Sequence, residues 1–122
     1  MILLKDLSIK YDGLQPEMYF ALGVASALRQ DLFKMNTVIT SLLEGHHNPG
    51  SLHPKGYAAD LRTLDLTSVE RQSFFTSLRA ELEPLGFQVI WEDGPGATAA
   101  TTGAHIHIEW DPHDGKHFWH FL

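Results

Sequence analysis

The alternation of polar and apolar residues in HIHIEW, residues 105–110, constrains the fold of this chain more than any other feature. Side chains of a β-strand point alternately to opposite faces, so the three polar residues share one face and the three apolar residues share the other. The apolar face predicts attachment to a hydrophobic core. The polar face presents the imidazoles of His105 and His107, whose roots lie about 7 Å apart, close enough for one or both rings to reach a metal ion.

The length of 122 residues is near the commonest size of a single domain, so we expect one domain spanning residues 1–122. A chain of this length buries about two-thirds of the surface that its unfolded form exposes, so it can fold without disulfide bonds. The sequence contains no Cys, which excludes thiolate zinc sites and cysteine nucleophiles.

The formal net charge of −6 and the lack of clustered Lys and Arg argue against a nucleic-acid partner. No apolar run reaches the length of a membrane span, so we expect no membrane insertion. The N-terminal residues MILLKDLSIKYDG contain too short an apolar stretch for a signal peptide, which favours a cytoplasmic protein as synthesised. We expect the chain to be a monomer.

Two segments predict helices. Residues 16–33 begin with Pro16, which suits the first position of a helix. Residues 67–86 begin with a capping box of Thr67 and Glu70. The apolar face expected of the first helix consists of Tyr19, Leu22, Leu28 and Leu32. The apolar face expected of the second helix consists of Val69, Phe74, Phe75, Leu78 and Leu82.

Short, β-branched or apolar segments predict strands at residues 37–42, 86–92 and 105–110. The last two flank residues 93–104, which are rich in small residues and predict a loop, so these strands should form an antiparallel hairpin. The sequence therefore predicts an α+β domain in which helices pack on a small antiparallel sheet.

The segment SLHPKGYAAD, residues 51–60, contains two further groups able to bind a metal, His53 and Asp60. They can share one ion only if the chain reverses between them, and the HPKG sequence is typical of such a turn because proline presets φ and glycine tolerates positive φ. The following residues 57–62 should be extended, with Asp60 and Arg62 on the same face. His53, Asp60 and His107 are therefore three candidate ligands from two distant segments.

These residues carry a specific resemblance. Ser51, His53, Gly56, Ala58 and Asp60 match the pattern Ser-x-His-x-x-Gly-x-Ala-x-Asp, and the downstream His-x-His resembles the second half of the same signature. This signature resembles that of the D-alanyl-D-alanine metallopeptidases, their phage L-alanyl-D-glutamate endolysin relatives and the hedgehog signalling domain that shares their fold. The similarity extends from about residue 40 to residue 110, and it implies the hedgehog-like zinc peptidase fold.

The resemblance implies that His53, Asp60 and His107 hold Zn²⁺, with water in the fourth position. An open position is typical of catalytic zinc, which lowers the pKa of its water and polarises a carbonyl. By the same resemblance, Ser51 lies on the substrate side of the site. His105 resembles the family's active-site histidine that is not a ligand, which stabilises the tetrahedral intermediate or transfers a proton.

The general base is where this sequence departs from part of the family. Several relatives have a glutamate a few residues before the last zinc ligand, but position 102 is Thr and position 104 is Ala. If residues 86–92 pair with residues 105–110, Glu92 should lie beside His105, and we therefore assign it as the catalytic base.

Two other side chains, Arg62 and Glu109, have open interpretations. Arg62 either binds a substrate carboxylate or forms a salt bridge within the fold. Glu109 either supports a metal ligand or faces water. The remaining histidines are interpreted as surface or packing residues; they are His46, His47, His113, His117 and His120.

The resemblance implies a zinc peptidase that hydrolyses bonds next to D-amino acids in peptidoglycan peptides, as an endolysin or as a D,D-carboxypeptidase. The lack of a signal peptide fits a phage enzyme released to the cell wall during lysis. One alternative is an inactive zinc-bearing binding or scaffold domain of the same fold. A second is a non-haem iron enzyme with two histidines and a carboxylate, although Glu109 follows His107 too closely for the usual cupin pattern.

Overall fold

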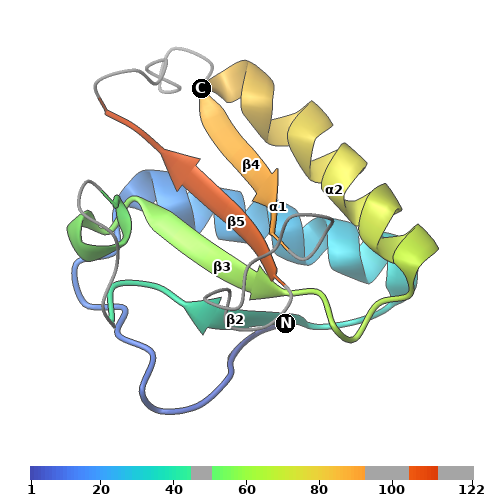
Figure 1. Ribbon diagram of the computed structural model, residues 1–122, viewed down its shortest axis with the longest axis horizontal. Helices are drawn as coiled ribbons and strands as arrows, with labels where there is room; N and C mark the ends of the chain where they lie inside the picture. The colour runs from blue at the N-terminus through green and yellow to red at the C-terminus, as the bar shows by residue number, and fades with distance from the viewer. Residues whose placement is uncertain (45–50, 93–104, 113–122) are drawn as a thin grey trace.

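The structure is a computed structural model, and it describes residues 1–44, 51–92 and 105–112. A five-stranded sheet with the strand order β1-β2-β3-β5-β4 organises these residues (Figure 1). The strands are β1 (Ile2–Leu4), β2 (Thr37–Ser41), β3 (Ala58–Arg62), β4 (Phe87–Trp91) and β5 (His105–Trp110). Strands β2, β3, β5 and β4 pair antiparallel, so the expected α+β class and the expected hairpin of β4 and β5 are confirmed.

Strand β1 was not expected from the sequence, and it pairs parallel with β2, so the sheet is not purely antiparallel. The strand has only three residues, and all three are exposed. It therefore lacks the alternation of buried and exposed side chains by which strands are recognised in a sequence. Its pairing with β2 is a contact between distant segments that local patterns do not reveal.

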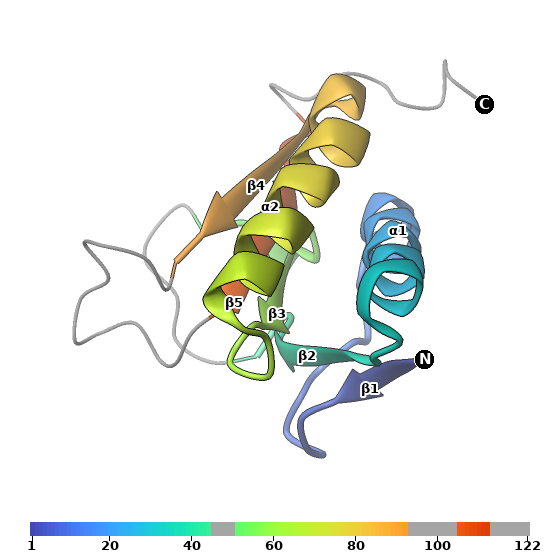
Figure 2. The same cartoon turned by 90° about the vertical axis from the view of Figure 1, so that its right-hand side faces the viewer.

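Both helices pack on the same face of the sheet, side by side (Figure 2). Helix α1 spans Pro16–Phe33 and begins at the expected proline. Helix α2 spans Ser68–Leu82, and the expected capping box is present: Thr67 Oγ1 accepts a hydrogen bond from the Glu70 amide, and the Glu70 carboxylate accepts one from the Thr67 amide. A short 3₁₀ turn, η2 (Glu83–Leu85), then leads into β4.

Helix α1 is rotated relative to its expected apolar face, whereas α2 buries Phe74, Leu78 and Leu82 as expected and departs only at Val69. In α1, Tyr19 and Leu32 are exposed, at 56% and 44% of their surface, and in α2 Val69 is 80% exposed. The buried stripe of α1 instead consists of Met18, Ala21, Leu22 and Ala25. This stripe follows the i, i+3, i+4, i+7 spacing of one helical face, and its small residues let the helix lie close to its neighbours.

The sheet has two different faces. Ile106, Ile108 and Trp110 of β5 are buried in the hydrophobic core between the sheet and the helices. By the alternation of strand side chains, the polar residues of β5 lie on the opposite face, which neither helix covers (Figure 1). The expected division of HIHIEW into a core face and a polar face is therefore confirmed.

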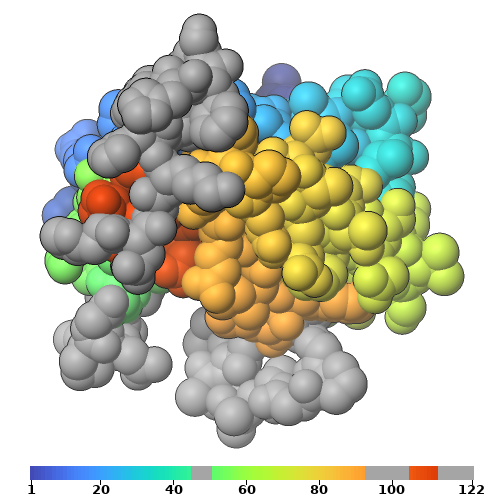
Figure 3. Space-filling view, turned by 90° about the horizontal axis from the view of Figure 1, so that it is seen from above, coloured from blue at the N-terminus to red at the C-terminus, as the bar shows by residue number. Residues whose placement is uncertain are grey.

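Strand β4 forms the outer edge of the sheet beside α2, and their side chains make a continuous surface (Figure 3). A groove on this surface is lined by Phe75 and Arg79 of α2, by Glu83 of η2 and by residues 87–91. This groove lies at the sheet edge, whereas the candidate metal ligands are on β3, on β5 and on the turn before β3.

Candidate metal centre

His53 is positioned by the turn that the HPKG sequence predicts. Residues His53–Lys55 form a 3₁₀ turn, η1, that contains Pro54 and ends at Gly56, whose φ is 80°. The Gly56 amide donates to the His53 carbonyl over 3.0 Å and closes the turn. The reversal places the His53 ring above β3, which begins two residues after Gly56.

Gly56 is also a point of close contact between two chain segments. A Cβ atom at this position would lie 2.2 Å from the carbonyl oxygen of Gly13. Because that oxygen belongs to the backbone, only glycine fits there without a shift of the main chain. The turn that positions His53 therefore depends on a glycine for both its φ angle and its packing.

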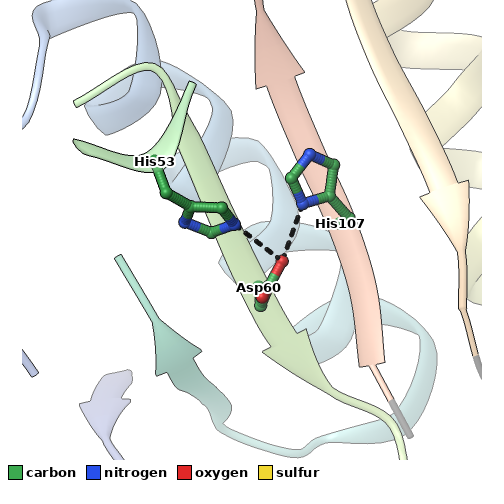
Figure 4. A group of neighbouring side chains, drawn as sticks. All are labelled: His53, Asp60 and His107. Atoms are coloured by element: carbon green, nitrogen blue, oxygen red, sulfur yellow. Dashed lines mark hydrogen bonds and ion pairs between the residues drawn. The ribbon is translucent and has the colours of Figure 1, made fainter. Parts of the chain in front are cut away.

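Pairing of β3 with β5 places Asp60 directly opposite His107. The two side chains and His53 point toward one another on the open face of the sheet (Figure 4). Asp60 Oδ1 lies 2.8 Å from His107 Nδ1 and 3.4 Å from His53 Nε2. One potential ligand atom from each residue lies within 4.8 Å of the others, so these three residues could hold a metal ion.

The other nitrogen of the His53 ring is held by the backbone. His53 Nδ1 is within hydrogen-bond distance of the Leu42 carbonyl oxygen, at the end of β2. A carbonyl oxygen only accepts hydrogen bonds, so Nδ1 carries a proton, and Nε2, which faces Asp60, is the nitrogen through which the neutral ring can bind a metal ion. Such an outer partner fixes both the orientation and the tautomer of a ligating histidine.

His107 has a carboxylate on each side of its ring. Its Nδ1 faces Asp60, and its Nε2 lies 3.0 Å from Glu109 Oε1. A ring that ligates through Nδ1 would therefore keep its Nε2 proton and donate it to Glu109. The Glu109 carboxylate thus contacts a candidate ligand, which is the geometry that the first of its two interpretations requires.

Asp60 and His107 each stabilise the charged form of the other. Burial raises the pKa of Asp60, but hydrogen bonds from His107 and His53 outweigh this effect and hold the pKa well below its usual range. Burial lowers the pKa of His107, but the hydrogen bonds to Asp60 and Glu109 and the negative charges of these two residues together outweigh it and raise the pKa above its ordinary value.

Glu92 lies beside His105, as the strand pairing predicts. Glu92 Oε2 is 2.8 Å from His105 Nε2, and the Glu92 amide donates to the His105 carbonyl over 3.0 Å. The same ring nitrogen of His105 is 3.7 Å from Asp60 Oδ2. The His105 side chain is 9% exposed and that of Glu92 is 39% exposed, so the pair extends from the buried carboxylate toward solvent.

The structure gives Ser51 a local role, since its hydroxyl oxygen accepts a hydrogen bond from the His53 amide over 3.2 Å. Arg62 lies opposite His105 in the pairing of β3 with β5, on the same strand face as Asp60. Residues 93–104 and the five histidines interpreted as structural are outside the described residues.

Two contributors to the site were missed in the sequence. One is Leu42, which acts through its carbonyl oxygen, a group that every residue carries. The other is Glu44, whose carboxylate accepts hydrogen bonds from the amides of Leu42 and Lys10. No residue pattern predicts either contact, because both depend on how the end of β2 lies against distant segments.

The comparisons with known proteins identify no family. No protein-family model matches the chain, and no curated protein has significant similarity to it. The geometry of the site is therefore the basis on which a function can be argued.

Among the described residues, no helix is both long enough and apolar enough to span a membrane.

Proposed function

We propose that this protein is a zinc-dependent peptidase that hydrolyses peptide bonds next to D-amino acids in peptidoglycan peptides. The observation that supports this proposal is the convergence of His53, Asp60 and His107 on one point of the open sheet face. The resemblance of SLHPKGYAAD and HIH to the D-alanyl-D-alanine peptidase signature supplies the reaction and the substrate class.

The donor set suits zinc. Two imidazole nitrogens and one carboxylate oxygen are the ligands that catalytic zinc sites use, and three protein ligands leave a position for water or substrate. The outer contacts of His53 with Leu42 and of His107 with Glu109 also fit, since ligating histidines usually donate their second N–H to a carbonyl or a carboxylate. Bound zinc would lower the pKa of a water molecule and polarise the scissile carbonyl.

Glu92 and His105 supply the acid and base chemistry in this proposal. The Glu92 carboxylate accepts a proton from the attacking water and delivers it to the amine that leaves. His105 lies between Glu92 and Asp60, where its ring orients the Glu92 carboxylate and donates a hydrogen bond to the negative charge that develops on the substrate. The greater exposure of Glu92 is consistent with contact with water and substrate.

Two experiments test the proposal together. Purified protein should bind one zinc ion per chain, and His53→Ala should lose that ion. Zinc-loaded protein should release new amines from peptidoglycan, and a chelator should stop the release. Glu92→Gln should retain zinc and lose most turnover, whereas Glu81→Gln, an exposed glutamate on α2, should retain both.

The outcomes separate the alternative functions. Stoichiometric zinc without amine release would favour the scaffold domain. Stoichiometric iron in protein purified without added metal would favour the non-haem iron enzyme. Near-normal turnover of Glu92→Gln would refute the role of this residue as the base.

A further inference from the structure

Arg62 belongs to a row of side chains that runs across the open face of the sheet. It lies opposite His105 on β5, and His105 in turn is paired with Glu92. The row that contains Asp60 and His107 is the next one along the strands. By strand geometry, the Cα atoms of Arg62 and Asp60 are about 7 Å apart, and those of Arg62 and Glu92 are about 10 Å apart.

The backbone and the side chain of Arg62 have different environments. Its carbonyl oxygen accepts a hydrogen bond from Nη1 of Arg29, which is completely buried and also pairs with Asp65. The half-buried Arg62 guanidinium has no hydrogen bond or ion pair with any described residue. Arg79, an exposed arginine on α2, does have such a partner, since it pairs with Glu83.

The acidic side chains of this face have partners among the described residues, whereas the Arg62 guanidinium does not. Asp60, Glu92 and Glu109 each contact a histidine ring. Arg62 is the only lysine or arginine among the described strand residues on this face, and no acidic residue is opposite it in the register. An arginine whose backbone is held by Arg29, and whose guanidinium has no anionic partner among the described residues, is suited to bind a planar carboxylate from outside the protein.

We propose that Arg62 binds the α-carboxylate of the residue whose amine is released, so that the site selects leaving residues with a free carboxylate next to the scissile amide. This inference rests on the proposed peptidase function, because Glu92 and His105 mark where the leaving amine lies. That carboxylate is three bonds from the scissile carbonyl carbon, on the amine side. The Arg62 row contains the proton donor for the amine and is adjacent to the Asp60 row.

Two kinds of substrate carry this group. One is a peptide whose C-terminal residue is released, as in carboxypeptidase action. The other is a peptide whose leaving residue is linked onward through its side-chain carboxyl and keeps its α-carboxylate free. The shared chemistry is an α-carboxylate next to the released amine, and matched peptides distinguish the two sources.

The test measures peptide binding to metal-free protein, which separates the Arg62 contact from turnover and from direct binding of carboxylate to zinc. The first probe pair is N-acetyl-D-alanyl-D-alanine and its C-terminal amide. The second pair is L-alanyl-D-glutamine, whose side-chain amide mimics an onward linkage, and the same dipeptide amidated at its α-carboxyl. Binding is followed by calorimetry and by chemical shifts of the Arg62 side-chain N–H groups.

In at least one pair, the wild type should bind the acid about 10- to 100-fold more tightly than the amide, as expected for a charge-assisted contact. The pair that shows this preference identifies the source. Arg62→Met should abolish the preference, Arg62→Lys should retain part of it, and Arg79→Met should retain all of it. Thermal unfolding and zinc content of each variant verify that it is folded.

Equal binding of acid and amide by the wild type in both pairs, including no measurable binding of any probe, would overturn the proposal. Retention of the preference in folded Arg62→Met would also overturn it. The result is independent of the peptidase assay. If the carboxylate preference depends on Arg62 but no turnover is found, the peptidase proposal is refuted and the carboxylate site stands. If turnover is found without the preference, the peptidase proposal stands and the carboxylate site is refuted.

Discussion

Glu109 Oε1 lies 3.0 Å from His107 Nε2, on the side of the ring opposite to Asp60. The spacing follows from the strand, because residues 107 and 109 of β5 are on the same face. The ring is thereby held between two carboxylates, one of which is a candidate ligand and the other an outer support. Substitution of Glu109 should therefore change the affinity of the site for zinc.

Glu109→Ala should weaken zinc binding about 10- to 100-fold, because loss of an outer hydrogen-bond partner lets the ligating ring rotate and lowers its basicity. Glu109→Gln should have a smaller effect, since the amide oxygen still accepts a hydrogen bond. Competition with a chromophoric chelator measures the affinity, with Glu81→Ala as a control on α2. Unchanged affinity of Glu109→Ala would contradict the assigned contact.

The pKa shifts predict opposite pH dependence for the ion-free and zinc-loaded protein. His107 has a raised pKa, so its stabilising contribution is complete below its unfolded value of 6.5 and is lost as pH rises through the folded value. Asp60 has a lowered pKa, so its contribution is present above the ordinary carboxyl range and is lost only in strong acid. The ion-free protein should therefore lose stability as pH rises above 6.5 and through the raised pKa of His107.

Zinc requires neutral imidazoles, so the stabilisation by zinc should increase over the same pH range. Thermal melts of both forms at several pH values measure this difference. His107→Gln should remove most of the decrease in the ion-free form. Parallel curves for the two forms would contradict the assignment of His107 as a ligand.

Gly56→Ala should destabilise the protein by about 2 kcal/mol or more, because alanine is strained at positive φ and its Cβ would meet the Gly13 carbonyl. Gly23, in α1, is a matched control, since a Cβ there meets nothing within 4 Å. Gly23→Ala should stabilise by about 0.5–1 kcal/mol. Denaturant unfolding measures both changes, and changes of the same sign would refute the prediction.

Glu44→Ala should weaken zinc binding although Glu44 does not contact the ligand atoms. Its carboxylate holds the amide of Leu42, whose carbonyl in turn holds His53. Loss of these contacts should cost about 1 kcal/mol of stability and lower zinc affinity several-fold. Glu44→Gln should preserve more of both. Asp6→Ala is a control because Asp6 is an exposed carboxylate that accepts hydrogen bonds from its neighbour Ser8, away from the candidate ligands. An equal loss in this variant would contradict a specific role of Glu44.

Local patterns accounted for much of the fold. The limits of α1, the capping box of α2 and the two faces of β5 were predicted because each depends on residues within a few positions of one another. The rotation of α1 was not predicted, since several residues along a helix can form an apolar stripe. In the folded protein, the stripe of small residues around Ala21 and Ala25 is the one buried where α1 packs against the sheet and α2.

For the candidate site, the residue types and spacing of SLHPKGYAAD and HIHIEW were sufficient to propose His53, Asp60 and His107 together. The tertiary structure decided the register that sets Asp60 opposite His107 and the contact of the Leu42 carbonyl with His53. It also decided the environment of Arg62, whose guanidinium has no partner among the described residues. The physical reason is the range of the interactions. Alternation and turn formation act between neighbours in the chain, whereas register, hydrogen bonds between distant segments and charge balance exist only after the strands have packed.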